Sequence, residues 1–207
     1  MDTRPELKVS FIVKTPVWPN PKDPRLTELV RGVDQEGKEV KLAVTVERPL
    51  TLFLNGREIV TMMTICDYPE YLAVGYLLNQ NMLRPDDEIV SIDYDDEIET
   101  VVVRTKNKTN FEEKLKKKTL TSGCAMGTVF GDVMEKFETV TLNQQTTIKT
   151  SWMIALFKAI NTAPSLYLEA GAIHGCVLCQ DDTVLVYMED VGRHNAVDKI
   201  AGYMYLH

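Results

Sequence analysis

The chain lacks any apolar run long enough to cross a membrane, and its 207 residues begin without the apolar stretch of a secretory signal. Its first residues are charged instead, with Asp2, Arg4, Glu6 and Lys8 close together. A spanning helix needs about 20 consecutive apolar residues, and a signal peptide needs a shorter apolar core behind a basic start. These absences predict a cytoplasmic protein without membrane association.

Basic residues are too few for a protein that coats nucleic acid. Lysine and arginine number 23 against 30 aspartates and glutamates, so the formal charge is -7. Because the phosphate backbone binds surfaces with an excess of positive charge, we expect no nucleic-acid partner.

Cysteine is scarce as well, which excludes a small scaffold held together by disulfides. The four thiols, Cys66, Cys124, Cys176 and Cys179, are expected to be reduced in a chain of this length. With 44% hydrophobic and 26% charged residues, the chain can bury a core of its own, in one or two domains.

The first half of the chain predicts β-hairpins around a single helix. Asn55-Gly56 tolerates positive φ and joins two apolar runs, which indicates a tight hairpin. Asp67 followed by Pro69 predicts the start of a helix that runs toward Leu83. The prolines between positions 16 and 24 predict an irregular surface segment. The expected strands are 8–14, 39–47, 51–54, 58–63, 89–94 and 98–105.

A lysine-rich segment at 106–118 leads into a glycine-containing loop that holds Cys124. Val129, Val133 and Phe137 predict a helix directly behind this loop. The lysines and the helix dipole favour the thiolate of Cys124, the form that attacks sulfur. A small residue buried in a tight turn is the alternative, and the local sequence leaves both interpretations open.

The second half predicts a helix at 151–161 and a hairpin of strands at 170–179 and 183–188. Cys176 and Cys179 stand three apart in the first of these strands, with His174 nearby, an arrangement that invites a zinc site. Residues three apart on a strand point to opposite faces, so the two thiols cannot easily reach one ion. Position 176 also lacks the glutamate of zinc deaminases, and we therefore expect no metal site.

The junction from Glu189 to Lys199 places acids, a glycine, a guanidinium, an imidazole and an amide between a short apolar strand and a helix. A helix amino terminus with Arg193 beside it favours an anion. His194 and Asp198 stand four apart, so the carboxylate is expected to orient the imidazole. The alternative is an ordinary capped helix whose charges face water.

Several segments together resemble the FdhD family, the formate dehydrogenase accessory sulfurtransferases. The resemblance covers almost all of the chain from about Glu39 onward, and the run from Glu189 to Lys199 is highly specific to the family. The segments that carry it are 47–51 with Asn55-Gly56, 71–78, 121–127, 171–174 and 189–199.

The resemblance implies a mixed α/β (α+β) fold. A small domain rich in β-hairpins, at 1–112, would join an α/β domain like that of cytidine deaminases, at 113–207. The family takes persulfide sulfur from a cysteine desulfurase and delivers it to the molybdenum (or tungsten) bis-pyranopterin guanine dinucleotide cofactor, which formate dehydrogenase requires. A homodimer is also implied, with no permanently bound cofactor.

Carried onto this chain, the resemblance makes Cys124 the catalytic sulfur acceptor of a sulfurtransferase. Lysines 114 and 116–118 would guide its loop to the desulfurase or to the anionic cofactor. The residues implied to hold the cofactor's phosphates and guanine, or to shape the transfer pocket, are His174, Gly192, Arg193, His194 and Asn195.

The chain departs from the family pattern at two places. Its loop carries one thiol, in Gly123-Cys124-Ala125-Met126, where many members carry Cys-x-x-Cys, so a relay between two cysteines of this loop is excluded. The chain ends at His207, whereas family members continue past this helix, so the second domain is expected to be shortened and incomplete. Two alternatives therefore stay open: a noncatalytic cofactor-binding chaperone and an inactive truncated homologue.

Overall fold

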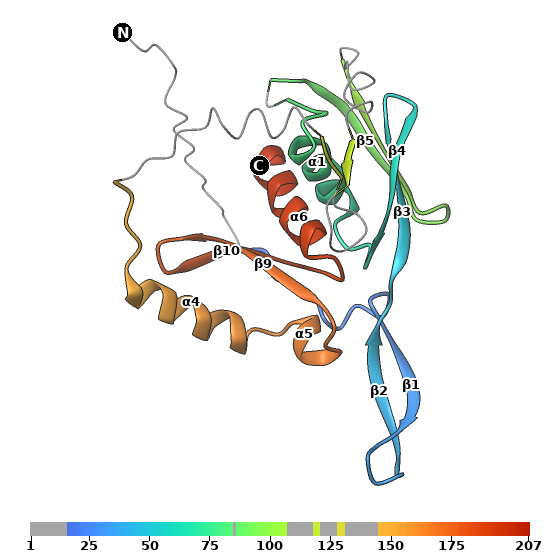
Figure 1. Cartoon of the computed structure of the whole chain (residues 1–207), viewed down its shortest axis with the longest axis vertical. Helices are drawn as coiled ribbons and strands as arrows, with labels where there is room; N and C mark the ends of the chain where they lie inside the picture. The colour runs from blue at the N-terminus through green and yellow to red at the C-terminus, as the bar shows by residue number, and fades with distance from the viewer. Residues whose placement is uncertain (1–15, 85, 107–117, 121–127, 131–144) are drawn as a thin grey trace.

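The computed structural model describes residues 16–84, 86–106, 118–120, 128–130 and 145–207, and Figure 1 shows how they are arranged. The described elements follow in chain order: β1 (Thr27–Val33), β2 (Glu39–Thr45), β3 (Arg48–Leu54), β4 (Arg57–Thr64), α1 (Pro69–Asn79), β5 (Ile89–Asp95), β6 (Thr100–Thr105), β7 (Lys118–Leu120), β8 (Thr128–Phe130), α4 (Thr150–Thr162), α5 (Leu166–Glu169), β9 (His174–Gln180), β10 (Thr183–Asp190) and α6 (Arg193–Leu206). The expected mixed fold of hairpin sheets and helices is confirmed.

The largest sheet has the strand order β4-β3-β6-β5. Its first hairpin turns at Asn55 and Gly56, whose φ values of 50° and 80° lie in the left-handed region that this dipeptide tolerates. The two hairpins predicted around 55–56 and 95–97 are confirmed, and β3 joins them by pairing parallel with β6. Alternate residues of β3 and β6 point toward α1 and form the main core with it: Leu50, Leu52, Leu54, Val101, Val103, Leu72 and Leu77.

Two helices from distant parts of the chain, α1 and α6, cross in very close contact. A Cβ atom on Gly75 would lie 1.7 Å from the carbonyl oxygen of Asp198, and one on Gly202 would lie 1.9 Å from the carbonyl oxygen of Tyr71. Only glycine leaves room for backbones at this separation. The crossing joins the last helix to the core of the first half, and the division at residue 112 stays a prediction.

The hairpin of β9 and β10 forms a second, two-stranded sheet, with α6 on one face. Cys176 packs on that face, beside Met188 and Ile200. Cys179 belongs to a different cluster with Tyr187 and Ala163, against which α4 also packs. The two thiols therefore lie on opposite faces of β9, as the strand period predicts.

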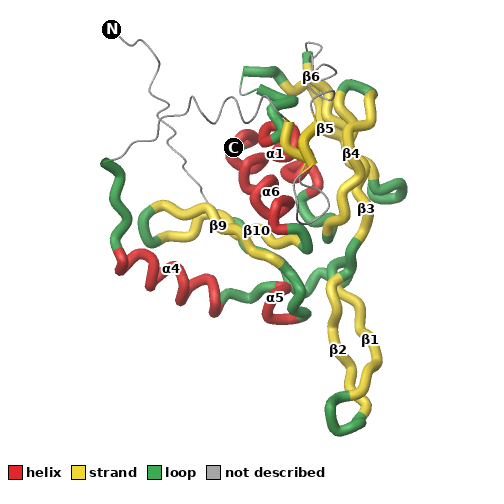
Figure 2. The backbone as a smooth tube through the Cα atoms, in the orientation of Figure 1, coloured by secondary structure: helices red, strands yellow, loops and turns green. Residues whose placement is uncertain are grey.

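Strands β1 and β2 form an arm that projects from the rest of the molecule (Figure 2). β2 lies within the strand predicted at 39–47, whereas its partner β1 was not predicted. The reason is that Thr27 to Val33 contains Gly32 and only a weak apolar alternation, so its pairing with β2 decides the structure.

Three further predictions met different outcomes. The helix expected from Val129 is wrong at its start, because Thr128 to Phe130 form β8, which pairs with β7; a β-branched and aromatic run favours a strand. Helix α1 ends at Asn79, before Leu83. The strand expected at 8–14 lies outside the described residues.

Among the helices in the described ranges, none combines the length and hydropathy that crossing a membrane requires.

Candidate functional site

The junction between β10 and α6 is built around two fully buried carboxylates, Glu189 and Asp190, which end β10. Glu189 accepts hydrogen bonds from the backbone N–H groups of Leu166 (2.8 Å) and Tyr167 (3.1 Å), which open the short helix α5. Burial raises the pKa of Glu189, while these two amide donors favour its charged form and oppose the rise. Glu189 therefore fastens α5 to the sheet.

Asp190 accepts hydrogen bonds from donors in the turn before α6, in α6 itself and in β4. Its Oδ1 accepts hydrogen bonds from the N–H of Gly192 (3.0 Å) and from the side-chain amide of Asn195 (2.9 Å). Its Oδ2 accepts from the hydroxyl of Thr64 at the end of β4 and lies 2.8 Å from Nζ of Lys199. Asp190 thus ties the turn before α6 both to the helix and to β4.

Lys199 completes this network with a side chain that has no exposed surface. Its ammonium contacts Asp67 as well as Asp190 and donates to the backbone carbonyl of Glu189 (2.9 Å). Burial by itself lowers the pKa of a lysine, but the carboxylates of Asp67 and Asp190 outweigh it and raise the pKa of Lys199 above its usual value. The junction is therefore joined to the loop between β4 and α1.

Helix α1 begins at Pro69, as the sequence predicts, and Asp67 lies just before it without capping it. The residue before α1 is Tyr68, in the left-handed region with φ 48°, and no side chain caps the helix. Asp67 turns toward Lys199 instead. The sequence could not signal this partnership, because 132 positions separate the two residues.

Three of the predicted site residues gather where α6 begins. Arg193 and His194 are exposed in the first turn of α6, and the cap residue Gly192 supplies no side-chain hydrogen bond. His174 opens β9 opposite Asp190 in the ladder, so it lies at the same end of the sheet and is exposed there. A helix amino terminus with cationic neighbours suits an anion.

Asn195 and Gly192 shape the junction from within. Asn195 is buried, and its side-chain amide donates to Asp190 and to the backbone carbonyl of Met63 (2.8 Å). A Cβ atom on Gly192 would lie 3.0 Å from that amide nitrogen, closer than ordinary van der Waals contact. The absence of a side chain at Gly192 thus lets the turn close over Asn195.

Asp198 is engaged elsewhere. It is buried against α1 and accepts a hydrogen bond from the side-chain amide of Asn79 (2.6 Å). The prediction that its carboxylate orients the imidazole of His194 is wrong, because the carboxylate points to α1 whereas His194 is exposed.

Cys124, the predicted sulfur acceptor, lies outside the described residues, and so do lysines 114, 116 and 117. The other three cysteines are free thiols, and burial raises the pKa of each. The pKa of Cys66 rises to about 11. Since the thiolate is the nucleophile, Cys66, Cys176 and Cys179 are poorly suited to attack sulfur near neutral pH.

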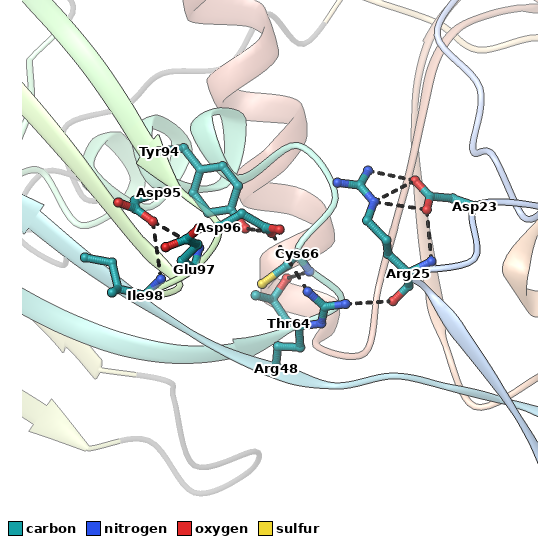
Figure 3. Close-up of polar contacts among 10 residues, drawn as sticks. All are labelled: Asp23, Arg25, Arg48, Thr64, Cys66, Tyr94, Asp95, Asp96, Glu97 and Ile98. Atoms are coloured by element: carbon teal, nitrogen blue, oxygen red, sulfur yellow. Dashed lines mark hydrogen bonds and ion pairs between the residues drawn. The ribbon is translucent and has the colours of Figure 1, made fainter.

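A cavity of about 370 Å³ lies at the start of α1, beside the base of the arm. Figure 3 shows the polar contacts at its edge, where Arg48 donates to the carbonyl of Arg25 (3.3 Å) and lies 3.9 Å from Asp96. Arg25 in turn pairs with Asp23 (2.7 Å). Sequence reasoning missed this cavity, because its walls come from separate segments: Asn20, Asp23, Arg25, Leu26, Cys66, Asp67, Tyr68, Pro69, Glu70 and Tyr94.

Comparison with known proteins connects this geometry to a family. Residues 45–207 match the model of the FdhD/NarQ family. Among similar curated proteins, the sulfur carrier protein FdhD of Bacillus pumilus is 28% identical over 165 residues, which cover 79% of this chain and 63% of that protein. The sulfur carrier protein FdhD of Bacillus subtilis is 28% identical over 188 residues, or 90% of this chain and 72% of that protein.

A solved structure agrees with the fold. The crystal structure of a formate dehydrogenase accessory protein from Desulfotalea psychrophila matches with a TM-score of 0.62 and 24% identity, over 87% of this chain and 70% of that one. At this identity the match supports the architecture. The chain spans 63% to 72% of the length of the two Bacillus proteins that it matches.

Proposed function

Because the chain belongs to the FdhD/NarQ family, we propose that it is a sulfur carrier and sulfurtransferase that works through Cys124. A cytoplasmic cysteine desulfurase supplies the sulfur, and the recipient is the molybdenum or tungsten bis-pyranopterin guanine dinucleotide cofactor destined for formate dehydrogenase. The single observation that carries this proposal is the family match over residues 45–207, which includes both Cys124 and the junction.

The first step, transfer of sulfur to Cys124, requires an ionised thiol on the protein. The thiolate of Cys124 attacks the outer sulfur of the desulfurase persulfide, a new S–S bond forms on Cys124, and the desulfurase cysteine leaves as a thiolate. The raised pKa values of Cys66, Cys176 and Cys179 support Cys124 as the acceptor, because burial disfavours the nucleophilic thiolate in those three residues.

The junction supplies a seat for the cofactor's phosphates. Exposed Arg193 and His194 stand at the uncapped start of α6, with His174 at the same end of the sheet. Arg193 offers forked donors to a phosphate, and free N–H groups of the first turn add to them. Asn195 and Gly192 contribute by fixing the turn from which Arg193 projects.

Intact-mass measurement after incubation with a cysteine desulfurase and cysteine tests the proposal. We expect one added sulfur on the wild-type chain and none on Cys124→Ala. Cys66→Ala is the matched control and keeps the adduct, because Cys66 is a buried, protonated thiol. An adduct that persists in Cys124→Ala, or that is absent from the wild type, contradicts the assignment.

Nucleotide binding tests the phosphate seat and, combined with the sulfur adduct, separates a carrier from a noncatalytic chaperone. Binding of guanosine diphosphate is expected to weaken in Arg193→Ala and to stay unchanged in Arg31→Ala, an exposed arginine on the arm. If Arg193→Ala binds normally, the junction is not the phosphate seat. Nucleotide binding without any sulfur adduct favours the chaperone.

A further inference from the structure

Thr64 is a polar residue at a position of β4 that faces the core. Met62 and Thr64 have 1% and 0% of their surface exposed, whereas Thr61 and Met63, which alternate with them, are exposed. Because alternate residues of a strand share a face, the position of Thr64 suits an apolar β-branched residue. Burying a hydroxyl costs free energy unless it is hydrogen-bonded, so the partner of this hydroxyl decides what it contributes.

The partner is Asp190, a carboxylate with no exposed surface. A carboxylate offers about four acceptor positions, two on each oxygen. Gly192 and Asn195 donate to Oδ1, whereas Thr64 donates to Oδ2 and the ammonium of Lys199 lies 2.8 Å from that same oxygen. Since both oxygens are fully engaged, the orientation of the carboxylate is fixed. Removal of the Thr64 hydroxyl would leave one acceptor position empty and let the carboxylate rotate.

The two donors on Oδ1 lie on either side of the exposed residues of the phosphate seat. Gly192 precedes the first residue of α6, and Asn195 is the third, so Arg193 and His194 lie between two residues held by one oxygen atom. A rotation of the Asp190 carboxylate therefore loosens both ends of the segment that carries Arg193. Binding side chains need supporting residues that hold them in the productive geometry.

The loop after β4 holds the hydroxyl of Thr64 in turn. The backbone N–H of Cys66 donates to the hydroxyl oxygen of Thr64 (3.3 Å), which leaves the single hydroxyl proton for Asp190. Cys66 has a φ of 57°, a conformation that is costly for a residue other than glycine and that persists only where the surroundings enforce it. Asp67, the next residue, pairs with Lys199. The loop thus contacts the junction at two points.

We propose that Thr64 is a positioning residue for the phosphate seat: through Asp190, its hydroxyl keeps Arg193 in place without touching the phosphate itself. The inference rests on the proposed function, because it requires Arg193 to bind phosphate. It extends the seat from the start of α6 to the end of β4, which lies 126 positions before Asp190 in the sequence.

Binding of guanosine diphosphate to full-chain variants at position 64 tests the inference. Thr64→Val keeps the shape of the side chain and loses the hydroxyl, and we expect it to weaken binding by about fivefold or more, as for residues coupled through one hydrogen-bond network. Thr64→Ser keeps the hydroxyl and should bind as the wild type does. Thr61→Val is the matched control: it removes an exposed hydroxyl from the same strand and leaves binding unchanged.

A residue that only fills space gives a different order of affinities. In that case Thr64→Val binds normally, whereas Thr64→Ser and Thr64→Ala bind more weakly, because affinity follows the volume of the side chain. The positioning role predicts that Thr64→Val and Thr64→Ala are both weak and that Thr64→Ser is normal. All variants are compared at a temperature where thermal unfolding traces show them folded, and Thr64→Ala replaces Thr64→Val if valine prevents folding. An affinity that follows volume overturns the inference.

A thermodynamic cycle with Arg193→Ala separates positioning from a general loss of stability. Thr64→Val should weaken binding strongly when Arg193 is present and much less when it is already alanine, since Thr64 acts through Arg193. Equal losses in both backgrounds overturn the inference. If Arg193→Ala binds weakly while Thr64→Val binds normally, the inference alone fails. If Arg193→Ala itself binds normally, the phosphate seat and the inference fail together, and sulfur loading of Cys124 is judged separately.

Discussion

Lys199 explains why the run from Glu189 to Lys199, which is highly specific to the family, contains so many charged residues. Its ammonium is enclosed by Asp67, Asp190 and the carbonyl of Glu189, without contact to water. The junction thus divides by residue: Glu189, Asp190, Asn195 and Lys199 hold the structure, whereas Arg193 and His194 face outward. Residue types alone do not reveal this division, because an acid or an amide serves equally well in a network or toward a ligand.

Removing the ammonium of Lys199 is expected to lower the stability of the fold strongly. Lys199→Met leaves the buried Asp190 and the partly buried Asp67 without their cation, and losing one partner of a buried ion pair typically costs about 3–5 kcal/mol of the free energy of unfolding. Urea denaturation should show a midpoint far below that of the wild type. Lys158→Met, on the exposed side of α4, is the control and should stay within about 0.5 kcal/mol. Similar midpoints for both variants would show that the buried network contributes little.

At the scale of elements, local turn chemistry was predictable and distant pairing was not. Asn55-Gly56 specifies its hairpin within a few residues, because positive φ is needed at both positions. Strand β1 has no comparable local signal and exists through its ladder with β2. The close crossing of α1 and α6 is also invisible in sequence, since Gly75 in isolation only weakens a helix.

This crossing makes Gly75→Ala a sharp test. In an exposed helix the change would stabilise by roughly 1 kcal/mol through helix propensity. Here the new Cβ would lie 1.7 Å from the carbonyl oxygen of Asp198, so the helices must separate, and we expect loss of the cooperative thermal transition or a strongly lowered Tm. Gly32→Ala is the control, because its Cβ would meet only a methyl group of Val40 at 4.0 Å. A Tm equal to or above that of the wild type would contradict the crossing.

At the scale of the whole molecule, contacts between the two ends of the chain hold it together. Lys199 reaches Asp67, Asp198 reaches Asn79, and Leu26 is buried with Leu166. The first and last segments therefore share buried surface and should lose it together on unfolding.

The burial of Asp198 makes stability depend on pH. Burial raises the pKa of Asp198 from an ordinary 3.8 to about 7, so between these values the folded chain keeps a proton that the unfolded chain releases. Stability should fall as pH rises from about 4 to about 7, by on the order of 4 kcal/mol from this group, and then level off. Asp198→Asn should reduce this fall, as urea midpoints at pH 5 and pH 8 would show. An unchanged pH dependence in the variant would mean that Asp198 ionises normally in the folded state.

The sequence by itself determined the hairpin at Asn55-Gly56, the helices at Pro69 and Thr150, the strands β9 and β10, and, through motif resemblance, the family. Each of these features depends on residues that are close together in the sequence. Only the tertiary structure decided that Asp67 forms an ion pair with Lys199, that Asp198 accepts a hydrogen bond from α1 and that His174 lies at the end of the sheet where α6 begins. These choices depend on which distant groups burial brings together, because a buried charge must find its partner wherever the fold places one.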